Sequence, residues 1–299
     1  MSLDGDAAPR VAAQRLRTGA WVRVRRGAYA ATAGLSADTY LRRRQLVLAR
    51  AVATVRQSAA AVVLSHDTAA VLWGLPLLDL PRVTSVVQNT RRAGNAADDV
   101  VRHRRSTAVQ DAVQLRGLPV TSLARTVVDC ACVLGVRAGL VVADAALAFG
   151  LDRHACADIV AGARGARGVR AARAVLDIAD DGAESPGETL ARWAVLRAGF
   201  PPPATQVAVD THLGTFWLDL GWPEWRLGAE FDGMGKYADS PRAVVLAEKR
   251  RQEAIEEAGW RLLRLTFADV RSPQALAQRL LRALGERAPS LTPRRHLGC

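Results

Sequence analysis

The chain has 299 residues, enough for two domains with separate hydrophobic cores. No uninterrupted apolar run reaches the roughly 18 residues of a membrane span, and Asp4 and Asp6 replace the basic start of an export signal. These features predict a cytoplasmic protein without a membrane partner. The formal net charge of +12 favours a polyanionic partner, because clustered cations release counterions from nucleic acid.

The N-terminal segment, residues 1–35, is strongly basic. A short helix is expected over residues 10–18, and basic residues alternate with apolar ones in WVRVRRGAYA, which predicts a strand or hairpin. Arg23, Arg25 and Arg26 would project into solvent or onto a phosphate backbone. The hairpin resembles the wing of a winged-helix domain, and GxWVRVRRGxYA is similar to the end of the N-terminal domain of AbiEi-family antitoxins. We therefore expect a partial winged-helix segment that binds DNA, with a solvated arginine-rich hairpin as the alternative.

A mostly helical α+β region is expected over residues 36–182. Its expected helices cover residues 40–56, 65–76 and 121–135, and its expected strands cover residues 82–88 and 100–106. The motifs SHDTAAVLWGLP, LPVTSLARTVVDCA and ADAAL resemble the middle region of AbiEi-like actinobacterial proteins. This resemblance implies a DNA-binding regulator whose partner is a cognate toxin. An acidic turn containing Gly182 marks the expected end of the region.

Residues 183–299 are expected to form an α/β domain. SPGETLARWAVLRAG opens with a helix-capping signature, Ser185, Pro186 and Glu188. The strand-like runs TQVAV, FWLDL and RLGAEFD follow, and then a helix over residues 242–258, the strand WRLLRLTF and a final helix over residues 275–284. The expected order is αβββαβα, with helices covering a four-stranded sheet.

Three acidic residues of this domain form the strongest candidate site. Glu230 and Asp232 are two residues apart on an expected strand and would face the same side, while Asp219 lies on the preceding strand. Three adjacent carboxylates repel one another without a cation, and Mg²⁺ prefers oxygen ligands. The pattern predicts a site for Mg²⁺ or Mn²⁺, and an Asp-Gly turn with no ligand is the alternative. No glycine-rich phosphate loop or dinucleotide fingerprint occurs, so no nucleotide cofactor is expected.

The pieces SPGE, LDL, EFDG, EKRR and GWRLLRLTFADV resemble the very-short-patch-repair endonuclease-like domains of the PD-(D/E)XK superfamily. The resemblance implies an αβββαβ restriction-endonuclease-like core and a Mg²⁺-dependent endonuclease that hydrolyses DNA with metal-activated water. It makes Asp219 and Glu230 the metal ligands. Asp232 stands where the superfamily pattern usually has lysine, which leaves that catalytic role to Lys236 or Lys249, or leaves it empty.

Two further residues have alternative roles. Glu188 either joins the acidic site, as in many members of the superfamily, or only caps its helix. Arg251 either contacts nucleic-acid phosphate or forms a solvated ion pair with Glu248, three residues earlier on the same helix. The alternative function is a non-enzymatic, DNA-binding transcriptional regulator of the type IV toxin–antitoxin kind.

Overall fold

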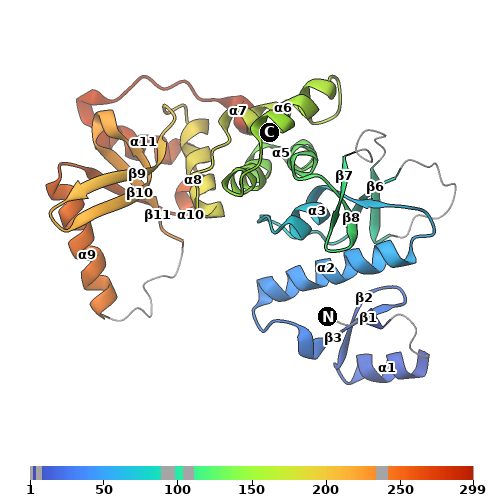
Figure 1. Ribbon diagram of the computed structural model, residues 1–299. Helices are drawn as coiled ribbons and strands as arrows, with labels where there is room; N and C mark the ends of the chain where they lie inside the picture. Colours follow the sequence, from blue (N-terminus) through green and yellow to red (C-terminus); the bar gives the residue numbers. More distant parts are fainter. Residues whose placement is uncertain (1–2, 5–8, 89–97, 104–110, 234–241, 299) are drawn as a thin grey trace. The chain divides into compact units, whose positions relative to one another are not determined.

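The computed structural model describes residues 3–4, 9–88, 98–103, 111–233 and 242–298, and it has a mixed α/β architecture with three sheets (Figure 1). The chain divides into two compact units. The N-terminal unit comprises Met1–Val133 and Asp152–Gly165, and the C-terminal unit comprises Leu134–Leu151 and Ala166–Cys299. The boundary expected at residue 182 therefore falls inside the second unit.

The N-terminal unit contains a three-stranded sheet of order β1-β3-β2 and a five-stranded sheet of order β6-β5-β4-β8-β7. Its strands are β1 (Leu3–Asp4), β2 (Trp21–Arg25), β3 (Ala28–Ala31), β4 (Val63–Leu64), β5 (Thr84–Val87), β6 (Val100–His103), β7 (Ala112–Leu115) and β8 (Leu118–Thr121). Its helices are α1 (Pro9–Arg17), α2 (Thr39–Gln57), α3 (His66–Trp73), the first part of α5 (Leu123–Ala148) and α6 (Arg153–Gly162). This part of the chain has more strand than the sequence predicted.

The basic alternating segment forms the expected hairpin. β2 and β3 pair antiparallel from Trp21–Ala31 to Arg25–Ala28, with a register shift between Arg23 and Arg25. The turn places Gly27 at a φ of 72°, a left-handed conformation that glycine adopts without steric cost. Helix α1 precedes the hairpin, as the sequence predicted.

Helix α5 is long and apolar enough to cross a membrane by length and composition, but 67% of its most apolar window is buried inside the protein. Gly135, with a φ of 78° and a ψ of 179°, interrupts its helical geometry. Burial of this kind is typical of a core helix in a soluble protein.

The C-terminal unit is built on a four-stranded sheet of order β12-β11-β10-β9. Its strands are β9 (Ala204–Thr211), β10 (Gly214–Trp222), β11 (Leu227–Phe231) and β12 (Arg261–Leu265). Its helices are the second part of α5, α7 (Val169–Ile178), α8 (Pro186–Arg197), α9 (Arg242–Glu257), α10 (Phe267–Arg271) and α11 (Pro273–Leu284). β9, β10 and β11 are antiparallel neighbours, whereas β11 and β12 are parallel.

A buried polar network joins α8 to the end of α5 within this unit. The Asp144 carboxylate accepts hydrogen bonds from Arg192 (2.7 Å), the Thr189 hydroxyl (3.0 Å) and the backbone N–H of Asp180 (2.9 Å). Burial raises the pKa of Asp144, although Arg192 opposes the shift. Asp144 and Asp180 precede residue 182, whereas Thr189 and Arg192 follow it. A buried charge is costly without a partner, so both sides of residue 182 belong to one packed unit.

Candidate acidic site in the C-terminal unit

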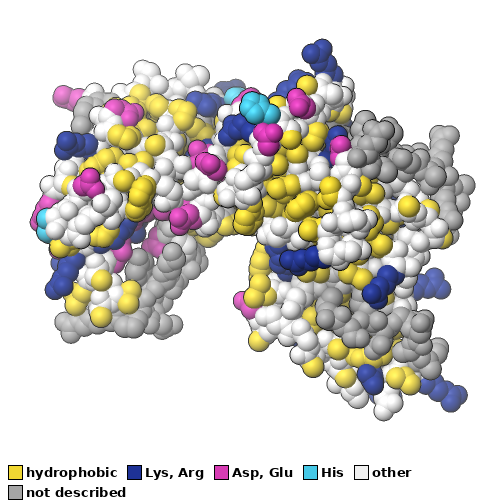
Figure 2. Space-filling model, viewed as in Figure 1, with side chains coloured by type: hydrophobic (Ala, Val, Ile, Leu, Met, Phe, Trp, Pro, Cys, Tyr) yellow, Lys and Arg dark blue, Asp and Glu magenta, His cyan; other side chains and the backbone are white. Residues whose placement is uncertain are grey.

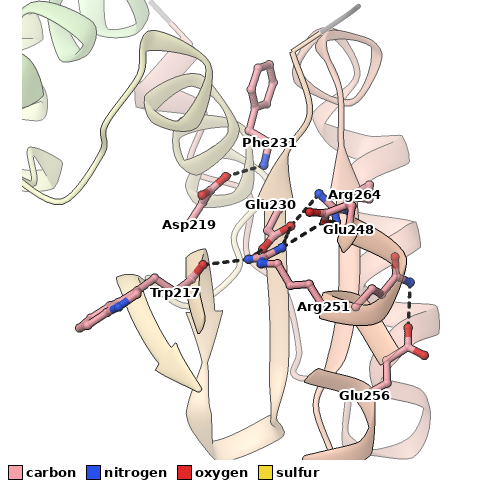
Figure 3. Close-up of polar contacts among 9 residues, drawn as sticks. Trp217, Asp219, Glu230, Phe231, Glu248, Arg251, Glu256 and Arg264 are labelled. Carbon is pink, nitrogen blue, oxygen red and sulfur yellow. Dashed lines mark hydrogen bonds and ion pairs between the residues drawn. The ribbon is translucent and has the colours of Figure 1, made fainter. Parts of the chain in front are cut away.

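Asp219 lies where the pairing between β10 and β11 ends. The register of the two strands runs from Trp222–Leu227 to Leu220–Ala229, and Asp219 is the next residue of β10. Its Oδ2 atom accepts a hydrogen bond of 2.7 Å from the backbone N–H of Phe231 (Figure 3). A side chain thus binds a β11 amide beyond the last backbone pair, which fixes the orientation of the carboxylate.

The neighbouring strand β9 is irregular opposite Asp219. Val207 pairs with Leu218 and Thr205 pairs with Leu220, so Gln206 lies opposite Asp219. Gln206 has a φ of 48°, which is uncommon for a residue with a side chain. Such conformations often occur at functional sites. Sequence periodicity gave no indication of this irregularity.

The pKa of Asp219 is raised from 3.8 to about 6. Burial is the largest cause, because it disfavours the charged carboxylate, and the negative charges of Glu188 and Glu230 add to the shift. The hydrogen bond from Phe231 and the positive charge of Arg251 act in the opposite direction. Asp219 is therefore a half-buried acid whose ionised form would be stabilised by an additional cation.

Glu188 helps to cap helix α8, which is one of the two roles that the sequence left open. Its Oε1 atom accepts a hydrogen bond from the Ser185 hydroxyl (2.7 Å), and its Oε2 atom accepts one from the backbone N–H of Glu184 (2.8 Å). The Ser185 hydroxyl in turn accepts the backbone N–H of Glu188 (3.2 Å). Capping accounts for both carboxylate oxygens of Glu188, while its charge still acts on Asp219.

Glu230 is buried, with a relative exposure of 5%, and two arginines bind it. Arg251 from α9 contacts both carboxylate oxygens, one of them at 3.1 Å, and Arg264 from β12 forms an ion pair of 2.7 Å with Oε2. Glu248 binds the same two arginines, and the Trp217 carbonyl accepts a further hydrogen bond of 3.1 Å from Arg251. Figure 3 shows these side chains converging from α9, β11 and β12.

Arg264 was missed in the sequence, although it is central to the site. It is paired with Glu230 in the parallel register of β11 and β12. Residues paired in this way lie side by side on one face of a sheet. The sequence shows only that Arg264 lies on an expected strand, and its pairing with Glu230 depends on which strand β12 joins.

The other candidate residues have different environments. Asp232 follows the end of β11, and its backbone N–H donates to the Leu265 carbonyl at 2.7 Å. Lys249 is exposed and forms an ion pair of 3.5 Å with Glu253, one helical turn away. Lys236 lies outside the described residues. Lys249 is therefore paired with Glu253 and not with the carboxylates of Asp219 and Glu230.

Fit to a divalent cation differs between the two expected ligands. Asp219 suits a hard cation, because its carboxylate is half buried among negative charges. The Glu230 oxygens are already occupied by guanidinium groups, so Glu230 fits only after these groups move away. The described part of the chain holds no cluster of three or more His, Cys, Asp or Glu side chains arranged to hold a metal ion.

The arginines of the N-terminal hairpin are not equivalent. Arg23 and Arg26 are exposed, whereas Arg25 forms an ion pair with Asp99 at 3.1 Å and retains only 11% side-chain exposure. On the face shown in Figure 2, the surface of the N-terminal unit carries mainly Lys and Arg among its charged side chains. Arg23 and Arg26 are thus the hairpin residues available to a polyanion.

No protein-family model matches the chain. The chain is 32% identical over 174 residues to the uncharacterized proteins MT2308 and Rv2248 from two strains of Mycobacterium tuberculosis, CDC 1551 / Oshkosh and ATCC 25618 / H37Rv. The alignment covers 57% of this chain and spans 64% of the length of these relatives. Among solved structures, the crystal structure of the RV2827C protein from M. tuberculosis is similar over 57% of this chain and 66% of its own, with 16% identity and a TM-score of 0.34.

Proposed function

We propose that the chain is a DNA-associated endonuclease of the PD-(D/E)XK kind, with Mg²⁺ or Mn²⁺ as cofactor and Asp219 as the central acid. The observation that carries this proposal is the half-buried Asp219 carboxylate at the end of the β10–β11 pairing, held by the Phe231 N–H and near the negative charges of Glu188 and Glu230. The order α8-β9-β10-β11-α9-β12 and the electrostatic effect of Glu230 on Asp219 support it.

The residues of the site have distinct roles in this proposal. Asp219 binds the cation with a carboxylate whose orientation is fixed by the Phe231 N–H. Arg251 and Arg264 are close enough to Glu230 to contact a phosphate brought to it, and guanidinium groups bind phosphate in a bidentate manner. A divalent cation at this position would polarise the phosphodiester and activate the attacking water. Arg23 and Arg26 would hold the nucleic-acid backbone at the N-terminal unit.

The decisive experiment is cleavage of a panel of DNA and RNA substrates with Mg²⁺ or Mn²⁺. The wild type is expected to cleave at least one substrate, and Asp219→Ala and Glu230→Ala are expected to lose cleavage. Asp210→Ala is a matched control, because Asp210 is an exposed acid of strand β9 that binds Thr215. Absence of cleavage on every substrate, or equal cleavage by Asp219→Ala, would overturn the proposal.

The binding of Glu230 by two arginines favours a second candidate, the antitoxin-type transcriptional regulator. An acid already neutralised by guanidinium groups needs no metal, so the domain would bind DNA or a cognate toxin without catalysis. Metal-free retention of DNA that Asp219→Asn leaves unchanged and Arg23→Ala weakens would support this function. Metal-dependent cleavage by the wild type would exclude a purely non-enzymatic role.

A further inference from the structure

The two arginines on Glu230 form a clamp, defined here as Arg251 and Arg264. Together they occupy both oxygens of a carboxylate that is almost fully buried. Glu230 also raises the pKa of Arg251, first through its hydrogen bond and then through its charge. Guanidinium–carboxylate bonds of this kind are among the strongest hydrogen bonds in proteins.

The clamp and a metal compete for the same atoms. A cation bound between Asp219 and Glu230 would have to share the Glu230 oxygens with the clamp, because Arg251 already binds both of them and Arg264 binds Oε2. The two guanidinium charges beside Glu230 also repel a cation. In the clamped state only Asp219 remains to bind the cation. Because Mg²⁺ dehydrates reluctantly and one partly exposed carboxylate is a weak site, metal affinity in this state should be low.

A phosphate group has the chemistry to open the clamp. Arg251 lies at the wall of a groove of about 690 Å³ that Arg250 also lines, and its guanidinium lies over the ring of Phe216. The side chains of Arg251 and Arg264 remain 21% and 31% exposed, so solvent reaches both arginines while Glu230 itself is covered. Arg251 and Arg250 line the groove together with Glu248, whereas Arg264 and Glu230 do not. A phosphate in the groove would therefore meet Arg251 first and would compete with Glu248 and Glu230 for its guanidinium.

We infer that Arg251 and Arg264 close Glu230 to a divalent cation and that a substrate phosphate opens it by drawing the arginines to itself. Metal and nucleic acid then bind cooperatively, because each favours the open clamp. This inference rests on the proposed function, since it concerns the same two carboxylates. It makes the arginines positioning residues that act on the metal through Glu230.

The first test measures Mn²⁺ binding to the full chain without nucleic acid, by titration calorimetry. The double variant Arg251→Gln/Arg264→Gln is expected to bind Mn²⁺ at least about tenfold more tightly than the wild type, because charge-assisted hydrogen bonds no longer compete for Glu230. Adding Asp219→Ala to the double variant should abolish the increase in Mn²⁺ affinity. Arg250→Gln is the matched control, because it removes the same charge from the adjacent, exposed position of α9. Equal Mn²⁺ affinity in the wild type and the double variant, or undetectable binding in both, would overturn the inference.

The double variant leaves Glu230 buried without a cation, so its folding is checked by circular dichroism. Arg264→Gln retains Arg251 on Glu230 and provides a milder variant, for which an intermediate Mn²⁺ affinity is expected. If only the milder variant folds, an affinity equal to that of the wild type would refute the clamp.

The second test measures the affinity of the full chain for a fluorescent DNA duplex in EDTA and in Ca²⁺. Ca²⁺ should tighten DNA binding by the wild type more than binding by the double variant. An equal effect in both proteins would refute release of the clamp by phosphate. Tighter Mn²⁺ binding by the double variant without cleavage by the wild type would support the clamp while the proposed endonuclease failed, so the two results are separable.

Discussion

Replacing Asp219 with asparagine should stabilise the C-terminal unit at pH 8 more than at pH 5. The asparagine carbonyl oxygen can still accept the Phe231 N–H, so the substitution removes charge and preserves the hydrogen bond. The folded state raises the pKa of Asp219, which means that it favours the neutral carboxyl group over the charged one. The contribution of this carboxyl group to folding stability is therefore fully present below its unfolded pKa near 3.8. That stability is lost as the pH rises through about 6. Asparagine does not titrate and avoids this loss.

The magnitude follows from the size of the shift. A rise in pKa from 3.8 to about 6 would correspond to roughly 3 kcal/mol at a fully buried site. Asp219 is partly exposed, so solvent screening reduces the effect to on the order of 1–2 kcal/mol. About half of this arises between pH 5 and pH 8. The difference in stability between the variant and the wild type should therefore grow by roughly 0.5–1 kcal/mol over this range.

Urea unfolding followed by tryptophan fluorescence is a suitable assay, because five of the seven tryptophans lie in residues 166–299. The urea titrations of the wild type and Asp219→Asn are carried out at pH 5 and at pH 8 with EDTA, which keeps divalent cations from the site. Asp210→Asn serves as the control, since this exposed acid lies on the adjacent strand and its replacement changes the net charge equally. A difference that stays constant with pH, or a variant less stable than the wild type at pH 8, would refute the assigned cause.

Three other substitutions test the packing around the site by urea unfolding. Arg192→Leu should lower the free energy of unfolding by about 3–5 kcal/mol, because it leaves the buried Asp144 carboxylate without its cation. A decrease below about 1 kcal/mol would contradict this account. Gly187→Ala should lower the free energy of unfolding by about 1–3 kcal/mol, because a Cβ atom there would lie 2.1 Å from the Phe231 ring. A variant as stable as the wild type would show that the ring can move aside. Lys249→Ala should change stability by less than about 0.5 kcal/mol, since its ion pair is exposed, and a larger loss would indicate a contact with the site.

The sequence predicted the order of elements from α8 to β12 because each of these elements carries a local signal. Ser185 and Glu188 mark the start of α8 by their reciprocal capping bonds, and the turn before Gly214 separates β9 from β10. Such signals depend on residues close together in the chain. Local chemistry was therefore sufficient for the order of these helices and strands.

The five-stranded sheet of the N-terminal unit was harder to predict. β4 has only two residues, within an apolar run that suits a helix as well as a strand. β7 and β8 join through Arg116 and Gly117, both with positive φ, and Pro119 makes the second strand appear unfavourable. β8 pairs with β4 only between Leu64 and Val120, a contact that no local pattern specifies.

The candidate site shows the same limit. Asp219 and Glu230 were found from their spacing on adjacent strands, whereas the partners of Glu230 depend on tertiary register. Arg264 reaches Glu230 through a parallel pairing across a helical crossover, and Arg251 reaches it from α9. Spacing identifies the acids, but only the assembled sheet identifies their counterions.

The carboxylate of Asp144 also limits how this protein can have been put together. Residues 134–151 belong to the same unit as the candidate site, yet Asp152–Gly165 lies between them and the rest of that unit. A fragment of residues 183–299 alone would lack both partners of Arg192, the Asp144 carboxylate and the Ile178 carbonyl. Residues 183–299 are therefore not an independent folding unit, and a fragment that keeps the Asp144–Arg192 pair has to include the second part of α5.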